Sequence, residues 1–341
     1  MKACGAVSVL SLITGGLGFI GSNLAIRLAR AGAEVYVLDA LLPGYGGNMF
    51  NLRPVQEKVQ VNISDMADEY ALRYFVTGQD YIFNLAGQVS HLDSMQDPYH
   101  DLEINARAQI SLLEACRKYN PEATVVYAST RQFYGRPRKL PVDEEHPIDP
   151  PDINGIHKYA GETYHMLYHK VYGLKTVALR LTNTYGPRQL IRNARQGFIG
   201  WFINRTVTGE PIELFGGGEQ VRDFNYVDDV VEAFLMAAGE KLCHGKFFNL
   251  SGEKASLGQV AGMLVDIAGA GDVRKVPFPE ERQRIDIGDF YGDSSLFRKI
   301  TGWQCRTGLE EGLARTVAYY MKYREHYLDE EVPLPGIKQA G

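Results

Sequence analysis

A glycine-rich turn near the start of the chain constrains its fold more than any other feature of the sequence. Segment 14–21 has glycines at positions 15, 16, 18 and 21, and it follows an apolar run that ends at Ile13. A helical pattern runs from Phe19 to Ala31, and a second apolar run covers Glu34–Leu38. Glycines at a strand–helix junction allow a tight turn and a close approach of the backbone to a pyrophosphate. The first forty residues therefore predict a βαβ unit that binds a dinucleotide.

The turn also predicts which residues contact the cofactor. A helix N-terminus carries unpaired backbone N–H groups and a partial positive charge, and both suit phosphate groups. We therefore expect the pyrophosphate to bind at Gly15, Gly18, Phe19 and Ile20. A glycine-rich turn without a ligand is the alternative.

An acidic residue at the end of the second strand predicts the type of dinucleotide. Asp39 stands 18 residues after Gly21, where a carboxylate accepts hydrogen bonds from the adenosine ribose. It would repel a 2′-phosphate, and neither Ala40 nor Leu41 supplies an arginine to offset that repulsion. NAD is therefore favoured over NADP. The alternative is a strand-end aspartate that caps a turn.

Strand and helix patterns continue to alternate as far as Leu181. Strands are predicted at Tyr81–Asn84, Thr124–Ala128 and Thr176–Leu181, with helices near Ile104–Lys118 and Ile156–Tyr172. This alternation predicts an α/β fold with a doubly wound, parallel, Rossmann-like sheet.

The pattern changes after Thr182, where Gly and Pro become frequent and the apolar pieces become shorter. Helices are predicted at Leu257–Ala268 and from Leu309 to about Tyr327. We expect an NAD-binding domain over residues 1–182, to which a segment near 222–250 returns. Residues 183–341 would then form mainly a second, smaller α/β substrate-binding lobe.

Composition excludes several classes of function. The 36 Lys and Arg residues against 41 Asp and Glu give a net charge of −5, which argues against a nucleic-acid or anionic membrane surface. No apolar run reaches the roughly 18 residues of a membrane span. The four cysteines are scattered, so neither a metal site nor a disulfide framework is indicated. We expect a cytoplasmic protein without a metal.

Several motifs resemble those of the extended short-chain dehydrogenase/reductase family, which comprises NAD-dependent nucleotide-sugar epimerases and dehydratases. The glycine spacing is one of them. The others are Asn84–Gln88, Asn105 with Leu112–Ala115, Ser129–Gly135, Arg180–Arg188 and Arg222–Asp229. The resemblance covers nearly the whole chain. It implies tightly held NAD, a nucleoside-diphosphate sugar bound between the lobes, and a homodimer formed through two helices per subunit, Ile104–Lys118 and Ile156–Tyr172.

The resemblance also implies roles for individual residues. Asn62 and Ile63 would lie at the adenine, and Leu85, Ala86, Gln88 and Asn105 along the cofactor. Asn183 and Arg222 would face the sugar diphosphate, and Arg284 is a further candidate, since guanidinium groups match phosphate oxygens. A solvated surface charge is the alternative for Arg284. The segment from Arg188 to Phe202 is more similar to the 2-epimerase that makes CDP-tyvelose than to common 4-epimerases, and its aromatic residues could stack a nucleobase or fill a core.

The family's catalytic pair, Tyr-x-x-x-Lys, is altered in this chain. Lys158 is present and would bind the nicotinamide ribose, but Asn154 stands where tyrosine is expected. An amide cannot exchange a proton near neutral pH, so Asn154 can orient a hydroxyl but cannot deprotonate it. His157 is a candidate for the missing base, and an ordinary helix-surface histidine is the alternative.

Two residues near the end of the Thr124–Ala128 strand predict the type of reaction. Thr130 occupies the family's Ser/Thr position and could hydrogen-bond the reacting hydroxyl. Gln132 stands at a substrate-binding position where the 4,6-dehydratases and UDP-glucuronate decarboxylases carry Glu, so those two reactions are disfavoured. The sequence favours an epimerase that oxidises a sugar carbon, most simply C4, and returns the hydride. The alternatives are a non-catalytic protein that binds NAD and a nucleotide sugar, or a related 4,6-dehydratase or 2-epimerase.

Overall fold

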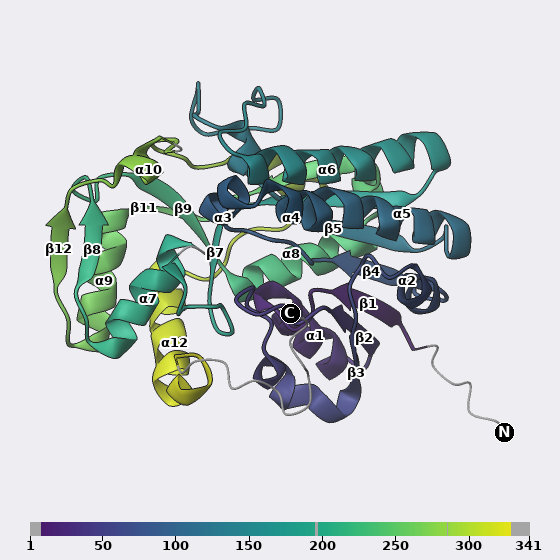
Figure 1. The fold of residues 1–341 in the computed structure, drawn as a ribbon, viewed down its shortest axis with the longest axis horizontal. Helices are drawn as coiled ribbons and strands as arrows, with labels where there is room; N and C mark the ends of the chain where they lie inside the picture. Colours follow the sequence, from purple (N-terminus) through teal and green to yellow (C-terminus); the bar gives the residue numbers. More distant parts are fainter. Residues whose placement is uncertain (1–7, 195–196, 285, 329–341) are drawn as a thin grey trace.

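A seven-stranded parallel sheet lies at the centre of the computed structural model, which describes residues 8–194, 197–284 and 286–328. Its strand order is β10-β6-β5-β4-β1-β2-β3. Figure 1 labels the part of this order from β5 through β4, β1 and β2 to β3. The strands are β1 (Leu10–Thr14), β2 (Glu34–Asp39), β3 (Val59–Ile63), β4 (Tyr81–Asn84), β5 (Thr124–Thr130), β6 (Lys175–Leu181) and β10 (Lys246–Leu250). The order reverses direction beside β1, which opens a crevice at the carboxyl ends of β1 and β4. The predicted Rossmann-like α/β fold is confirmed.

Helices cover both faces of this sheet and build two apolar cores. On one face α1 (Phe19–Arg30) packs against α8 (Val227–Gly239). On the other face α2 (Glu69–Val76), α5 (Ala108–Tyr119) and α6 (Ile153–Tyr172) pack together. Strands buried on both faces need continuous apolar runs, and this explains why the sequence of β1 and β5 does not alternate.

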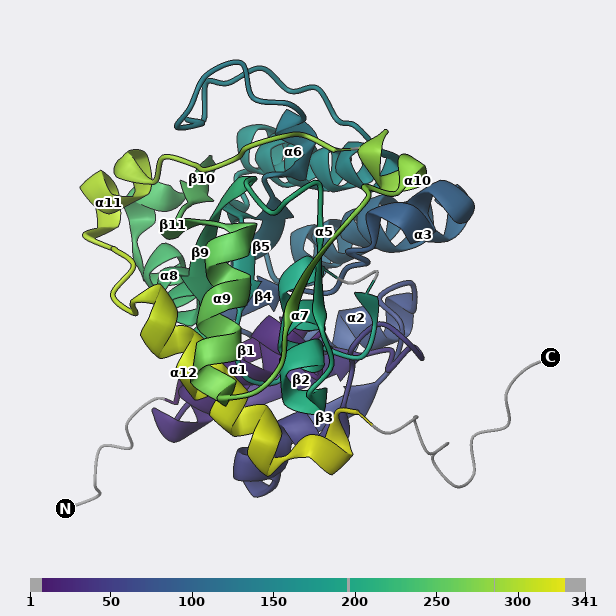
Figure 2. The ribbon, with the colours of Figure 1, turned by 90° about the vertical axis from the view of Figure 1, so that its left-hand side faces the viewer.

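The remaining elements form a second lobe beside the carboxyl edge of the large sheet. A three-stranded sheet joins β7 (Asn183–Tyr185), β9 (Val221–Tyr226) and β11 (Glu253–Ser256), and a pair joins β8 (Ile212–Phe215) to β12 (Val273–Val276). Helices α7 (Phe198–Thr208), α9 (Leu257–Ala268) and α12 (Leu309–Lys322) lie in front of the large sheet in Figure 2. In the sequence, the short helices α10 (Glu280–Gln283) and α11 (Ser295–Thr301) come between α9 and α12. The chain returns to the first sheet through α8 and β10.

The structure shifts several predicted boundaries. The C-terminal helix ends at Lys322, and a 3₁₀ turn (Arg324–His326) follows it instead of a continuous helix to Tyr327. The helix predicted from Ile104 starts instead with a π-helical turn (Glu103–Arg107), preceded by α4 (Pro98–Leu102) and α3 (His91–Gln96). A 3₁₀ segment (Met49–Lys58) precedes β3. Within the described ranges, no helix is long and apolar enough to cross a membrane.

Candidate functional site

The glycine turn between β1 and α1 is shaped by close backbone contacts. Gly15 has a φ of +68°, and a Cβ there would lie 2.8 Å from the Ala86 backbone. A Cβ on Gly21 would lie 2.3 Å from the Gly15 carbonyl oxygen, so the first turn of α1 can pack on the loop only without a side chain. The helix begins without a side-chain cap at Gly18 and without an acidic residue in its first turn. Its N-terminus therefore suits a pyrophosphate, in agreement with the fit of a dinucleotide.

Asp39 braces this turn and still faces the pocket. Its Oδ2 accepts from the Leu17 N–H at 2.9 Å, and its Oδ1 accepts from the Leu41 N–H at 2.8 Å. Burial raises the pKa of Asp39, although both backbone bonds oppose that shift. Each carboxylate oxygen has a second lone pair, so the group can cap its own turn and also accept from ribose hydroxyls. The two interpretations of Asp39 are therefore compatible.

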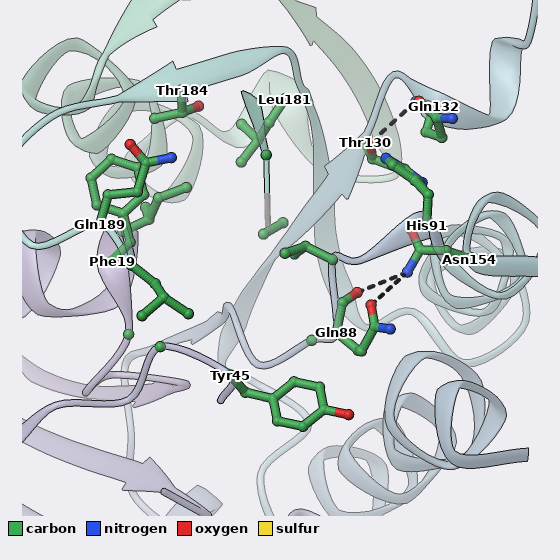
Figure 3. A pocket seen from close by; sticks show the side chains of 18 of the residues that line it. Phe19, Tyr45, Gln88, His91, Thr130, Gln132, Asn154, Leu181, Thr184 and Gln189 are labelled. Carbon is green, nitrogen blue, oxygen red and sulfur yellow. Dashed lines mark hydrogen bonds between the residues drawn. The ribbon is translucent and has the colours of Figure 1, made fainter. Parts of the chain in front are cut away.

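One cavity of about 620 Å³ extends from the glycine turn to the second lobe, a size that suits a cofactor or a drug-sized ligand. It gathers most of the predicted site residues, some of which Figure 3 shows. Those that line it are Gly15, Gly18, Phe19, Ile20, Asp39, Leu85, Ala86, Gln88, Thr130, Gln132, Asn154, Lys158, Asn183 and Arg222. Carboxyl ends of parallel strands meet at one sheet edge, which explains why residues so far apart in sequence converge there.

Two predicted adenine contacts lie beside the cavity lining rather than in it. The Asn62 side chain accepts from the Ser64 hydroxyl at 2.6 Å, and the Ile63 side chain is exposed at the end of β3. The next residues, Ser64 and Asp65, do line the cavity. The carboxyl end of β3 is thus in place, and its lining residues are one or two positions later than the resemblance implied.

Asn105 and Arg284 are placed differently from the sequence prediction. Buried Asn105 binds the backbone of Gln88 twice, accepting from its N–H at 3.2 Å and donating to its carbonyl at 3.0 Å. It shapes the loop after β4 without lining the cavity. Arg284 is exposed and pairs with Glu280 one turn earlier on α10. The surface-charge alternative therefore describes Arg284, because its side chain is solvated and directed at a neighbouring acid.

Lys158 is held in place by contacts with two residues of β5. Its Nζ donates to the Ala128 carbonyl at 2.7 Å and lies 4.6 Å from the centre of the Tyr127 ring. Burial lowers the pKa of Lys158 to about 8, although Asp101 and Glu162 oppose the shift. Thr130, at the carboxyl end of β5, accepts from the Gln132 N–H at 3.1 Å, so its hydroxyl proton stays available to another acceptor.

The side chain of Asn154 is engaged in structural hydrogen bonds. Its Nδ2 donates to the Gln88 carbonyl at 2.9 Å and to Asp101 Oδ2 at 3.1 Å, and its backbone N–H donates to the Ser94 hydroxyl at 3.1 Å. The orientation of the amide follows from these acceptors. Asn154 therefore ties the first turn of α6 to the loop after β4, and offers the cavity its carbonyl oxygen.

His157 does not line the cavity. Its Nδ1 lies 2.7 Å from Oδ1 of Asp101, whose side chain is fully buried, and only 13% of the His157 side chain is exposed. Both interpretations of this residue are wrong: it is neither a base in the cavity nor an ordinary surface histidine. Its imidazole instead satisfies a carboxylate that also holds Asn154 and Asn105.

The aromatic residues of α7 divide between the cavity and the core. Phe198 and Trp201 line the cavity, so they are available to stack on a planar group. Phe202 also borders it but is 5% exposed and packs edge-on against Phe198, with ring centres 5.6 Å apart.

Arg131 lines the cavity and was missed by the sequence interpretation, although it stands inside a matched motif. Burial lowers the pKa of Arg131 to about 9, and repulsion from Arg222 adds to that shift. Among described residues its buried Nη1 has no hydrogen-bond partner. Arg222 donates to the backbone carbonyls of Val221 and Gly288 and lies 3.7 Å from Asp286. Two guanidinium groups with spare donors predict an anionic ligand group in this part of the cavity.

His91 is another cavity-lining residue that was missed. It is the first residue of α3 and follows the matched Asn84–Gln88 motif by three positions. A polar, titratable side chain at the start of the helix that follows a central strand was the signal that could have identified it.

Comparisons with known proteins agree with this geometry. A model of the NAD dependent epimerase/dehydratase family matches residues 11–251. UDP-glucose 4-epimerase of Mycolicibacterium smegmatis is 32% identical over 91% of this chain and 98% of the relative. CDP-paratose 2-epimerase of Salmonella typhi is 30% identical over 89% of this chain and 97% of the relative. The structure of Thermotoga maritima UDP-glucose 4-epimerase with UDP-glucose superposes with a TM-score of 0.84 at 32% identity, over 93% of this chain and all of that one.

Proposed function

Because the chain belongs to the NAD dependent epimerase/dehydratase family, we propose that this NAD-dependent enzyme inverts C4 of a nucleoside-diphosphate sugar. The observation that carries the proposal is that Thr130, Lys158 and the glycine turn all line one cavity. It brings hydroxyl-binding and cofactor-binding groups to one sheet edge. Bound NAD would accept a hydride from the sugar carbon and return it. Around that exchange, Thr130 polarises the hydroxyl and Lys158 holds the nicotinamide ribose.

The neutral amide of Gln132 favours epimerisation over dehydration. Its Nε2 donates to Oδ2 of Asp152 at 3.0 Å, so the amide is oriented by a buried carboxylate. Removing water from a sugar needs an acid that protonates the leaving hydroxyl, and a neutral amide cannot do this. The carboxylate of Asp152 has no exposed surface and also accepts from the Gly155 N–H at 2.7 Å. Dehydration therefore has no acid at position 132.

A panel of sugar nucleotides tests the proposed activity. Pure protein would be incubated with UDP-, GDP-, CDP- and dTDP-linked hexoses, and the products resolved by chromatography and proton NMR. We expect one or more C4 epimers to form without net production of NADH. A stable 4-keto-6-deoxy product would identify a dehydratase, and inversion at C2 would identify a 2-epimerase. Bound NAD with no product from any donor would contradict the proposed activity.

Restoring the family's tyrosine is expected to reduce activity. In Asn154→Tyr the Gln88 carbonyl and Asp101 each lose one buried donor, although Asn105 still donates to both, so the expected cost is about 0.5–1.5 kcal/mol for each lost hydrogen bond. We expect the melting temperature to drop and turnover to fall at least about tenfold, because Gln88 lines the cavity and a small displacement of a cavity group can cost about a hundredfold in rate. Turnover and thermal melting would be measured with the bound NAD content as control. A silent wild type that gains activity on this change would instead support a non-catalytic binding protein.

We also propose a homodimer through α5 and α6, which lie side by side at the top of Figure 1. Apolar side chains at Ile156, Leu167 and Val171 of α6 are about half exposed. Their spacing places them on one stripe of the helix. Ile110 of α5 is partly exposed as well. Apolar stripes of this kind support an interface with a second copy.

A charge on this stripe is expected to separate the subunits. Leu167→Arg would place an unpaired cation in an apolar interface, so the mass in solution should fall from twice 38.1 kDa to 38.1 kDa. Light scattering after gel filtration measures it. Met321→Arg on α12, where the replaced side chain is comparably exposed, is the matched control and should leave the mass unchanged. A monomeric wild type, or a dimeric Leu167→Arg, would contradict the proposed interface.

A further inference from the structure

Oxidation of a sugar hydroxyl releases a proton, and the residue at position 154 cannot accept it. Resting on the proposed function, we propose that His91, oriented by Asp152, transfers this proton. His91 lines the cavity, whereas Asp152 lies behind it. A histidine paired with a buried carboxylate is an arrangement that enzymes use for proton transfer.

The contact between His91 and Asp152 determines which ring nitrogen is available. Nδ1 of His91 lies 3.0 Å from Oδ2 of Asp152, at ion-pair distance although not aligned as an ideal hydrogen bond. Nδ1 is shielded from solvent, while 37% of the His91 side chain is exposed. The carboxylate thus favours the tautomer with a proton on Nδ1. Nε2 is then the basic nitrogen, and it belongs to the exposed part of the ring.

Asp152 is held as a carboxylate by its position in the fold. It caps the N-terminus of α6, where its Oδ1 accepts from the Gly155 N–H. Its Oδ2 receives both the Gln132 amide and the His91 contact. Burial alone would raise the pKa of Asp152, but these contacts outweigh burial and lower it. An ionised carboxylate behind the ring stabilises the imidazolium that forms when His91 takes a proton.

Hydrogen bonds place His91 beside the altered tyrosine position. The Ser94 hydroxyl donates to the His91 carbonyl at 2.7 Å and accepts from the Asn154 N–H at 3.1 Å. Gln132 is linked to His91 through the same Asp152 oxygen. In Figure 3, His91, Thr130, Gln132 and Asn154 gather on one side of the pocket. The imidazole therefore stands on the wall where the resemblance places the reacting hydroxyl.

The proton step balances in both directions. Bound NAD would supply the hydride chemistry at the sugar carbon, and the O–H proton released in that oxidation would pass to Nε2 of His91. A ketone and an imidazolium–carboxylate pair result. On return, the imidazolium gives the proton back to the ketone oxygen as the C–H bond re-forms on the opposite face.

Lys158 is the competing proton acceptor in the cavity. Its Nζ already donates to the Ala128 carbonyl, which aligns it as an ammonium donor. The other charged or titratable residues on α3 and on the helices packed against it include Asp93 of α3, Asp97, His100 and Asp101 at α4, and His157 of α6, and Arg131 follows β5. A pH–rate profile of wild type and His91→Gln separates the candidates, because an acidic limb that belongs to His91 is lost in the variant, whereas one that belongs to Lys158, whose pKa burial lowers to about 8, persists.

The experiment measures turnover of the active sugar nucleotide by wild type, His91→Gln and His91→Ala. We expect His91→Gln to lower kcat about a hundred- to ten-thousandfold, the usual worth of a general base, with KM and bound NAD little changed. The acidic limb of the wild-type profile should vanish in this variant, and added imidazole should restore turnover to His91→Ala. His244→Gln, a change outside the cavity lining, is the matched control and should match wild type.

Two results would overturn the role of His91. One is wild-type turnover in both His91 variants. The other is an acidic limb near pH 8 that persists in His91→Gln, which would assign the proton to Lys158. If wild type converts no sugar, the proposed activity fails, and nitrogen NMR of the histidine rings decides the pairing separately. We expect an Nδ1–H tautomer for His91 that Asp152→Asn weakens, and a predominant Nε2–H tautomer in wild type would refute the pairing.

Discussion

Replacing Gly15 with alanine is expected to lower the affinity for NAD at least about a hundredfold, or about 2.8 kcal/mol. Two costs combine in this variant. A non-glycine residue at φ +68° is strained by about 1–2 kcal/mol. The new Cβ would also lie 2.8 Å from the Ala86 backbone, which cannot rotate away as a flexible side chain would. The loop must therefore shift, and the pyrophosphate would lose its aligned N–H donors.

Titration calorimetry with NAD, on protein stripped of cofactor, measures this loss. Gly262→Ala is the matched control, since Gly262 lies within α9 and a Cβ there would meet no atom of the described part of the chain within 4 Å. We expect Gly262→Ala to bind NAD as wild type does. Circular dichroism would establish that Gly15→Ala remains folded. Wild-type affinity in a folded Gly15→Ala protein would show that the turn does not hold the dinucleotide.

Replacing Arg180 with methionine is expected to cost about 3–5 kcal/mol of unfolding free energy, as when one partner of a buried ion pair is removed. Arg180 and Glu162 are each 2% exposed, and three guanidinium–carboxylate contacts join them. The Ser129 hydroxyl donates to the same carboxylate at 2.6 Å. Without Arg180, the buried Glu162 charge would keep one hydroxyl donor, Ser129, among the residues that the structure describes.

A double substitution separates the pair from its parts. In Arg180→Met with Glu162→Leu, no charge is left unpaired, and apolar replacements of buried ion pairs are often nearly neutral. We expect the double variant to be more stable than Arg180→Met in chemical denaturation. Glu162 lies one helical turn after Lys158 on α6, so Arg180→Met should also weaken cofactor binding. Equal stability of Arg180→Met and wild type would refute a structural role for this pair.

Much of the candidate site could be predicted because its signals are local. The spacing of Gly15, Gly18 and Gly21 reports one strand–turn–helix junction, and Asp39 stands at a fixed distance beyond it. Thr130, Asn154 and Lys158 were found in short motifs in the same way. The structure places all of these at one cavity, where Gly21 also packs the helix against the turn.

The predictions that differ from the structure depended on orientation. Asn105 and His157 stand on helices close to the cavity, yet their side chains bind Gln88 and Asp101. Asn105 lies in the π-helical turn Glu103–Arg107, where the residues are rotated relative to an ideal α-helix. The periodicity of the sequence does not indicate this turn. Arg284 differs in another way. Its guanidinium could have bound a phosphate, but in the structure it is exposed and pairs with Glu280, one helical turn earlier.

The order of residues along the chain was sufficient for the α/β fold, the dinucleotide turn and the loss of the family's tyrosine, because each depends on short-range spacing. Folding decided what stands near Asn154. His91 starts α3, Gln132 follows β5 and Asp152 caps α6, and the three meet only because β4 and β5 end side by side and α6 starts next to them. A hydrogen bond requires its partners within about 3 Å, and separation in sequence does not constrain that distance.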